Sequence, residues 1–446
     1  MIRRAGILAA LVLLGSSQLV AQHNRVDTVT PMAPDLAAYG PIAVGVRTIT
    51  ATDRNRVDVL GTEEGGPIAR YDRTVTIEVW YPAALAPGQA PGGVYRTVAR
   101  DPARPAELHG RAVRDAAPAT APAGGCPLII ISHGYPGNRF LLSHLAENLA
   151  SKGFVVAAPD HPDSTYADQK AFASTLYNRP YDQLFVLGEL DRLSRTGSGS
   201  FLAGLADVTR TGVIGYSMGG YGVMNVLGAG FSDASIAGRN APPNRLLAER
   251  AASNPAYPKQ ADTRIKAAIA IAPYGGASGA WTPDALGAIT TPVLFVAGSA
   301  DDIVGYETGV RALFLAATRS DRYLLTFLQG SHNVAAPIPA PAEAWAYSEA
   351  LKASPFMHYE DGVWDSVRSN NVLQHFATAF LSIYLKGETD KQAYLDLVPR
   401  GSDGVYSVER DGRPKPDYTY WKGFKPRTAP GLVLEHLPAG KAPLPE

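Results

Sequence analysis

The sequence predicts an α/β protein built on a mostly parallel sheet of about eight strands, with helices on both faces. Two observations predict this class. Continuous apolar runs at 127–131, 154–158 and 292–296 are bounded by turn residues, which is typical of strands buried on both faces. Segments of helical period separate these runs, and alternating strands and helices favour a parallel sheet covered by helices.

The individual elements follow from local pattern, taken in chain order. Apolar or β-branched runs predict strands at 44–50, 74–80, 127–131, 154–158, 211–214, 265–272, 292–296 and, as the last, 323–327. Helical period predicts helices at 139–152, 167–194, 220–227, 306–317, 371–385 and 391–397. Residues 83–125 are rich in Pro, Ala and Gly and predict a surface excursion. Residues 228–263 predict a lid-like insertion with a candidate helix at 244–252.

Composition limits the class of partner. The chain has 446 residues, of which 46% are hydrophobic, and this is ample material for a large core. Lys plus Arg and Asp plus Glu are both 41, so the net charge is zero and neither nucleic acid nor an anionic membrane is expected as a partner. We expect one catalytic domain over 40–400, with the tail at 401–446 packing on it.

The N-terminus has the features of a secretory signal. Arg3 and Arg4 precede an apolar stretch at 7–14 that is too short to span a bilayer, and small residues lead to a cleavage site near Ala21. We expect a signal peptide at 1–21, a periplasmic or secreted protein, and no stable membrane insertion after cleavage; a short membrane anchor is the alternative. Cys126 is the single cysteine, and it predicts a small buried apolar side chain.

The chain is organised around residues 215–219, a Gly-x-Ser-x-Gly motif. A strand-type run precedes the motif and a helical run follows it, which is the context that a nucleophilic serine requires. The sharp turn would strain the backbone of Ser217 and raise its hydroxyl above the sheet. Glycines at Gly215 and Gly219 would let the strand and the helix approach without a side chain between them. The alternative is a plain turn.

Ser217 needs a base, because a free hydroxyl is a poor nucleophile near neutral pH. His332 comes directly after the last predicted strand, whereas the other histidines lie in loops, in the tail or on amphipathic helices. A carboxylate should orient that base, and Asp301 or Asp302 follows the penultimate strand. Parallel strands place these three chain positions at one edge of the sheet, which favours a Ser-His-Asp triad.

The tetrahedral intermediate of acyl transfer also needs hydrogen-bond donors. We expect the backbone N–H of Met218 to be one donor, and the N–H of Tyr135, in the loop after residue 131, to be the other. Gly134 and Gly137 would let that loop bend toward the substrate. His133 could be read as catalytic, but a role in bracing this loop is favoured.

Two further groups of residues have alternative interpretations. Residues 160–163 contain the residue types of a metal site but lack a partner cluster, so a hydrogen-bonded loop is favoured and neither a metal nor another cofactor is expected. Tyr135, Tyr274 and Trp281 lie near predicted strand ends. They are candidate substrate contacts, and simple packing is the alternative.

Several of these stretches resemble the α/β-hydrolase superfamily, and more closely the bacterial dienelactone-hydrolase-like proteins related to plasma platelet-activating-factor acetylhydrolase. The resemblance rests on residues 132–134, 149–161, 215–220 and 330–332. It implies ester hydrolysis without a cofactor. Members of the superfamily usually carry Gly-x-x-Asp after the penultimate strand, and counting from Gly298 reaches Asp301. Dienelactone hydrolases use a cysteine nucleophile, and here Ser217 holds that place.

The sequence therefore predicts a serine hydrolase that cleaves small-molecule or lipid carboxylic esters through an acyl-enzyme. Hydrolysis of the short acyl chain of a phospholipid is an alternative within the same class. A catalytically silent binding protein that keeps the fold is the alternative of another class.

Overall fold

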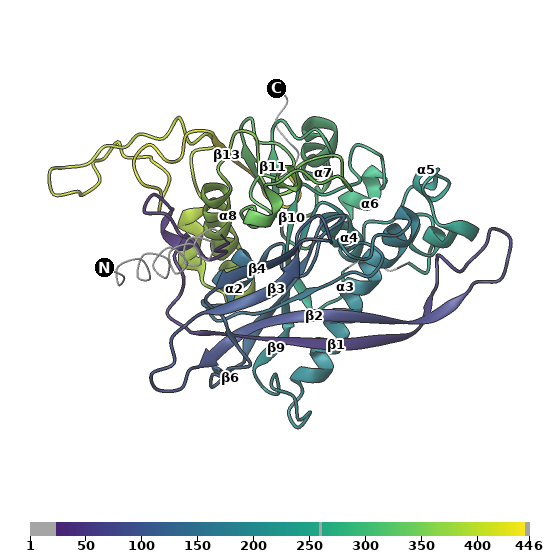
Figure 1. The fold of residues 1–446 in the computed structure, drawn as a ribbon. Helices are drawn as coiled ribbons and strands as arrows, with labels where there is room; N and C mark the ends of the chain where they lie inside the picture. The colour runs from purple at the N-terminus through teal and green to yellow at the C-terminus, as the bar shows by residue number, and fades with distance from the viewer. Residues whose placement is uncertain (1–23, 258–260, 442–446) are drawn as a thin grey trace, which may run out of the picture.

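A computed structural model describes residues 24–257 and 261–441 of the chain (Figure 1). The signal peptide expected at 1–21 lies outside the described residues. Within the described ranges, no helix has both the length and the apolar character that a membrane span requires.

The central element is an 11-stranded sheet in the order β13-β12-β11-β10-β9-β7-β8-β2-β1-β5, with β6 paired to β2. The strands from β12 to β8 in this order are parallel to one another, whereas β1, β2 and β13 pair in antiparallel fashion. The predicted fold class, a mostly parallel sheet covered by helices, is confirmed. The strands are β1 (Val44–Val57), β2 (Arg70–Ala84), β5 (Val113–Arg114), β6 (Ala117–Pro118), β7 (Cys126–Ser132), β8 (Val155–Pro159), β9 (Ala206–Tyr216), β10 (Ile265–Ile271), β11 (Val293–Gly298), β12 (Arg322–Phe327) and β13 (Leu432–Leu437).

All eight expected strands are present, and β5, β6 and β13 are additional. The expectation that 323–327 ends the sheet is wrong, because β13 from the tail pairs with β12 in antiparallel fashion. Leu432 and Leu434 of β13 are buried. An added strand satisfies the backbone groups of β12 that would otherwise form an exposed sheet edge.

The interpretation of residues 83–125 as a surface excursion needs correction. Besides β5 and β6, this stretch forms a separate two-stranded sheet of β3 (Gly93–Val98) and β4 (Pro105–Gly110). Tyr95 anchors this hairpin, because its side chain is fully buried and its hydroxyl contacts the carboxylate of Glu147 and the indole N–H of Trp80. These long-range contacts give order to a segment whose composition indicates loops.

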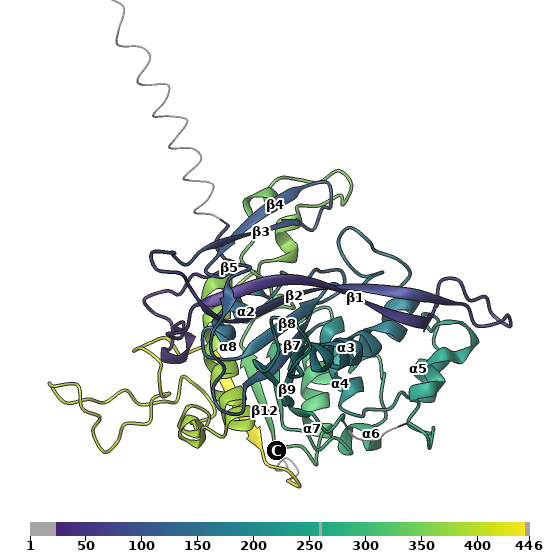
Figure 2. The same cartoon turned by 90° about the horizontal axis from the view of Figure 1, so that it is seen from below.

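Helices cover both faces of the sheet. The main α-helices are α2 (Ser143–Ala150), α3 (Phe172–Ser194), α4 (Met218–Val226) and α8 (Ser366–Leu381), and the shorter ones are α5 (Asp233–Ile236), α6 (Pro283–Gly287) and α7 (Ala312–Ala316). Short 3-10 or π segments are η1 (Asp35–Ala37), η2 (Pro243–Arg250), η3 (Tyr306–Arg311), η4 (Ala342–Ala344), η5 (Pro355–His358), η6 (Ser382–Lys386) and η7 (Thr389–Tyr394). Figure 2 shows α2 and α8 on one side of the central strands and α3 and α4 on the other.

Two predicted helices differ from the structure for identifiable reasons. The helix expected at 139–152 begins only at Ser143, because the backbone N–H and guanidinium of Arg139 bind the carboxylate of Asp160 and hold the preceding residues in a loop. The candidate helix at 244–252 is a 3-10 segment in which Asn244 has a φ of 53°. Its side chain accepts a hydrogen bond from the N–H of Gly65, beyond the end of β1.

Candidate active site

The Gly-x-Ser-x-Gly stretch forms a sharp turn between β9 and α4. Ser217 has φ 54° and ψ −112°, a strained conformation for a residue that is not glycine. A Cβ on Gly215 would lie 2.2 Å from the backbone of Gly219, and a Cβ on Gly219 would lie 2.0 Å from the carbonyl oxygen of Ser132. The two glycines are therefore required for the close approach of strand and helix.

The structure brings Ser217, His332 and Asp301 together at the carboxyl ends of β9, β12 and β11. The Nε2 of His332 lies 3.0 Å from the Oγ of Ser217, and its Nδ1 lies 2.9 Å from Oδ2 of Asp301. A carboxylate can only accept a hydrogen bond, so Nδ1 carries the proton and the lone pair of Nε2 faces the serine hydroxyl. All three residues are less than 10% exposed, which strengthens these interactions relative to water.

Asp301 is held in its ionised form. Burial alone would raise the pKa of this carboxyl, but the hydrogen bond and charge of His332 and two backbone N–H groups outweigh burial and lower it. Oδ1 accepts from the N–H of Ile303 at 2.9 Å and of Val304 at 3.0 Å. Asp302 is exposed and makes no hydrogen bond to a described residue, so the geometry singles out Asp301 as the partner of His332.

The loop after β7 lies directly beside the serine. A Cβ on Gly134 would lie 3.4 Å from the Cβ of Ser217, so the backbone that leads into Tyr135 borders Ser217. Met218 is the first residue of α4, and the N–H groups of a first helical turn have no acceptor within the helix. The two backbone donors expected for an oxyanion therefore belong to the loop after β7 and to the start of α4, which meet at Ser217.

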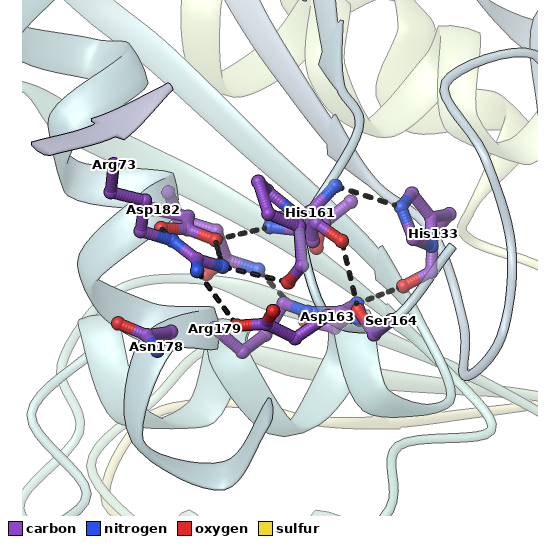
Figure 3. Close-up of polar contacts among 12 residues, drawn as sticks. Arg73, His133, His161, Asp163, Ser164, Asn178, Arg179 and Asp182 are labelled. Atoms are coloured by element: carbon purple, nitrogen blue, oxygen red, sulfur yellow. Dashed lines mark hydrogen bonds and ion pairs between the residues drawn. The ribbon is translucent and has the colours of Figure 1, made fainter. Parts of the chain in front are cut away.

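His133 and the loop at 160–163 belong to a buried polar cluster behind this loop (Figure 3). The N–H of His161 donates to Nε2 of His133 at 3.2 Å, while the ring of His161 binds Ser132 and Asp182. Burial lowers the pKa of His161 to about 3, so its ring is neutral. No group of metal-binding side chains occurs among residues 24–257 and 261–441.

A cavity of about 720 Å³ opens in front of Ser217 and His332. Its walls come from the loops that follow β7, β9, β11 and β12, and from residues 356–358 and 360–362. Ile303 and Met357 line it and are 64% and 74% exposed, and the neighbouring Val363 is 68% exposed. Ile303 and Met357 are among the most exposed large apolar side chains of the described residues, so the cavity has an apolar rim.

The three aromatic candidates for substrate contact do not lie together. Tyr135 lines the cavity, and its ring packs edge-on against Phe172 at 5.1 Å. Tyr274 also packs edge-on against Phe172, at 5.6 Å, and does not line the cavity. Trp281 is buried, its ring lies 5.6 Å from that of Tyr221 in α4, and it does not line the cavity.

The described part of the insertion at 228–263 contributes no residue to the cavity wall. It instead lies near the tip of the β1–β2 hairpin, where Asn244 binds the backbone of Gly65 and Gly66. Part of the cavity wall comes instead from residues 356–358 and 360–362, which follow His332 in the chain.

The sequence reasoning did not single out Tyr216 or Asn333. The ring of Tyr216 lies 5.3 Å from that of His332, and its hydroxyl donates to Oδ1 of Asn333 at 2.8 Å. The amide of Asn333 donates in turn to the carbonyl of Met357 at 2.8 Å and so holds the wall segment beside His332. Both residues adjoin a predicted triad member, which is the only signal in the sequence that could have found them.

Comparisons with known proteins agree with this architecture. A solved ferulic acid esterase from Streptomyces cinnamoneus superimposes with a TM-score of 0.52 over 80% of this chain and 94% of that chain, at 21% identity. The chain has the α/β-hydrolase fold. Residues 110–183 also match the family described as platelet-activating factor acetylhydrolase, isoform II, and that match includes the loop after β7 but does not reach Ser217. No curated protein matches the chain.

Proposed function

We propose that this chain is a serine hydrolase that cleaves carboxylic esters through an acyl-enzyme. The observation that carries the proposal is the continuous hydrogen-bonded relay from Ser217 Oγ through His332 to Asp301, on a strained turn that opens into a cavity. The α/β-hydrolase fold and the resemblance of residues 110–183 to an acetylhydrolase family support the same reaction class.

In the first half-reaction, Ser217 Oγ attacks the acyl carbon while Nε2 of His332 accepts the hydroxyl proton. Asp301 stabilises the imidazolium that forms and keeps the ring in its orientation. The former carbonyl oxygen becomes an oxyanion that the N–H groups of Tyr135 and Met218 stabilise. Collapse of this intermediate breaks the ester C–O bond, and the departing alkoxide takes the proton from His332.

In the second half-reaction, a water molecule gives its proton to Nε2 of His332 and attacks the acyl-enzyme. A second tetrahedral intermediate forms at the same oxyanion donors. Its collapse breaks the bond to Ser217 Oγ, which recovers the proton from His332, and releases the carboxylic acid. This sequence needs no cofactor or metal.

Hydrolysis of p-nitrophenyl butyrate by purified protein tests the proposal. Ser217→Ala should abolish turnover, whereas Ser331→Ala, at the other serine that lines the cavity, should keep most of it because its hydroxyl donates to Asp361 instead of His332. Absence of turnover in the wild type, or full activity of Ser217→Ala, would disprove the proposal.

A phospholipid with a short or oxidised acyl chain is a second candidate substrate. The family match and the apolar rim of Ile303 and Met357 favour it over a fully polar ester. Comparing kcat/KM for a micellar short-chain phospholipid with that for a soluble ester of the same acyl group separates the two. A binding protein without activity would leave Ser217 unlabelled by a fluorophosphonate, which mass spectrometry detects.

We further propose that the protein is exported to the periplasm or outside the cell. Arg3, Arg4 and the short apolar stretch after them support this. N-terminal sequencing of the mature protein should find a start close to residue 22, and recovery of an intact N-terminus from the cytosol would contradict it.

A further inference from the structure

The peptide unit between Gly134 and Tyr135 is held on its carbonyl side by two donors. The Gly134 oxygen lies 2.7 Å from Nδ1 of His133 and 3.3 Å from Nη2 of Arg179. The C=O and N–H of a trans peptide point in opposite directions. Donors that fix the carbonyl on the buried side of the loop therefore also fix the direction of the Tyr135 N–H on the opposite side.

His133 can only act as a donor to this carbonyl. Its Nε2 accepts a hydrogen bond from the N–H of His161, so the ring proton resides on Nδ1. Burial, together with the charge of Arg179, lowers the pKa of His133 well below its usual range. The ring is therefore a neutral donor at any pH at which the protein would work.

Arg179 supplies a charge at the same place. It projects from α3, is 1% exposed, and donates to the carbonyl of His133, to that of Gly134 and to the hydroxyl of Ser164 (Figure 3). Burial lowers its pKa and nearby Asp182 partly offsets this, but a guanidinium stays protonated near neutral pH. Among the described residues it forms no ion pair within 4.0 Å, so its donors are directed at loop oxygens.

The same helix also reaches the other half of the site. One turn after Arg179, the amide of Gln183 donates to the carbonyl of Gly219 at 3.0 Å. The carbonyl of Ser217, which shares a peptide unit with the N–H of Met218, accepts from the N–H groups of Tyr221 and Tyr274 at 3.0 Å. Both peptide units expected to face the oxyanion thus have their carbonyls held by two donors each.

We infer that Arg179 is a positioning residue of the oxyanion hole. The inference rests on the proposed esterase function and names a residue that acts through the peptide between Gly134 and Tyr135. Hydrogen bonds in a chain polarise one another, so a cation bound to the carbonyl makes the N–H of the same peptide a stronger donor. The benefit grows as negative charge develops on the substrate oxygen, so it lowers the barrier more than it improves substrate binding.

Arg179→Met tests the inference, with Arg192→Met as the matched control. Arg192 lies on the same helix but is exposed, and among the described residues it is paired only with Glu189. Loss of a whole oxyanion donor costs about 100- to 1,000-fold in kcat, so loss of its support should cost roughly 10- to 100-fold. KM should change by less than about threefold. The inhibition constant of a trifluoromethyl ketone, which forms the oxyanion, should rise by the same factor as kcat falls. Arg192→Met should match the wild type.

Arg179→Lys provides a second measurement, because one ammonium keeps the charge but cannot donate to both carbonyls with the same geometry. The lysine variant should keep the fold and recover part of the kcat lost in Arg179→Met. If the methionine variant does not fold, a kcat of the lysine variant about tenfold below that of the wild type, at unchanged KM, supports the inference. A wild-type kcat in either folded variant, or a higher KM at constant kcat, would overturn it. If the wild type is inactive or Ser217→Ala is active, the proposed function itself has failed.

Discussion

Replacing Asp301 by asparagine should disable the base while leaving the fold intact. Asp301 accepts three hydrogen bonds, from His332 Nδ1 at 2.9 Å, from Ile303 N–H at 2.9 Å and from Val304 N–H at 3.0 Å. An asparagine oxygen can keep the two backbone bonds, and its NH₂ group then faces His332. Nδ1 must then accept, so the ring proton moves to Nε2, which can no longer take the proton of Ser217. The rate loss should be on the order of ten-thousand-fold, or about 5.5 kcal/mol of transition-state stabilisation.

The matched control is Asp302→Asn, because Asp302 is exposed and makes no hydrogen bond to a described residue. Steady-state hydrolysis of p-nitrophenyl butyrate by both variants gives kcat and KM, and urea unfolding checks that the two proteins have similar stability. Asp302→Asn should stay within about twofold of the wild type. A large loss in Asp302→Asn with a small one in Asp301→Asn would refute the assignment, and wild-type rates in both would place the orienting carboxylate elsewhere.

Further predictions concern stability. Asp182 is paired with Arg73, whose charge and hydrogen bonds outweigh burial and hold the pKa of Asp182 far below its usual range. The stability that this ion pair contributes is therefore present above about pH 4 and lost below it. Asp182→Asn should lower the free energy of unfolding, measured in urea at pH 7, by about 3–5 kcal/mol. Burial lowers the pKa of Lys152 to about 7. Between pH 7 and about 10 the unfolded chain therefore binds more protons than the folded chain, so the free energy of unfolding should rise with pH in this range. Lys152→Met should remove that rise. Gly219→Ala should abolish activity or folding, since the added Cβ would clash with Ser132. Gly188→Ala on α3 has nothing near its Cβ and should raise the free energy of unfolding by about 0.5–1 kcal/mol. Equal effects of the two substitutions would contradict the packing argument.

The predicted sheet follows from features that are local in the sequence. The apolar runs that become β7, β8 and β11 are buried along their whole length, so composition alone indicates strands covered on both faces. The missed strand β13 carried a weaker signal, the alternation of Leu432 and Leu434 with less buried neighbours. Composition does not distinguish a half-buried edge strand from a loop in a tail that has many turn residues.

The lengths of β1 and β2 show a different limit. The sequence predicts about seven residues for each, but the structure has 14 and 15. The residues that extend the hairpin at its tip, 51–57 and 70–73, are largely polar, and among the described strands they pair only with each other. Such a two-stranded extension can continue into solvent without an apolar pattern. Their length is therefore set by cross-strand hydrogen bonds that local pattern does not report.

Of the residues near Ser217, some could be expected from the sequence and others are brought there only by long-range contacts. His332 and Asp301 could be anticipated because each follows a strand, and strands of a parallel sheet end at one edge. The wall at 356–362 could not be anticipated, because it returns to the site through contacts such as that between Asn333 and Met357. Trp281 was a plausible contact by its place after a strand, yet its ring packs against Tyr221 of α4 and does not line the cavity.

The sequence by itself determined the parallel sheet, the strained turn at Ser217 and the chain order of serine, aspartate and histidine, because strand burial and the need for glycine at a tight turn are properties of neighbouring residues. Only the tertiary structure decided which segment walls the cavity and which buried arginine supports the loop of Tyr135. Those features depend on side chains that meet across long stretches of chain, as Arg179 of α3 meets the carbonyl of Gly134 after β7. Such meetings are set by how the layers pack, and no local pattern encodes them.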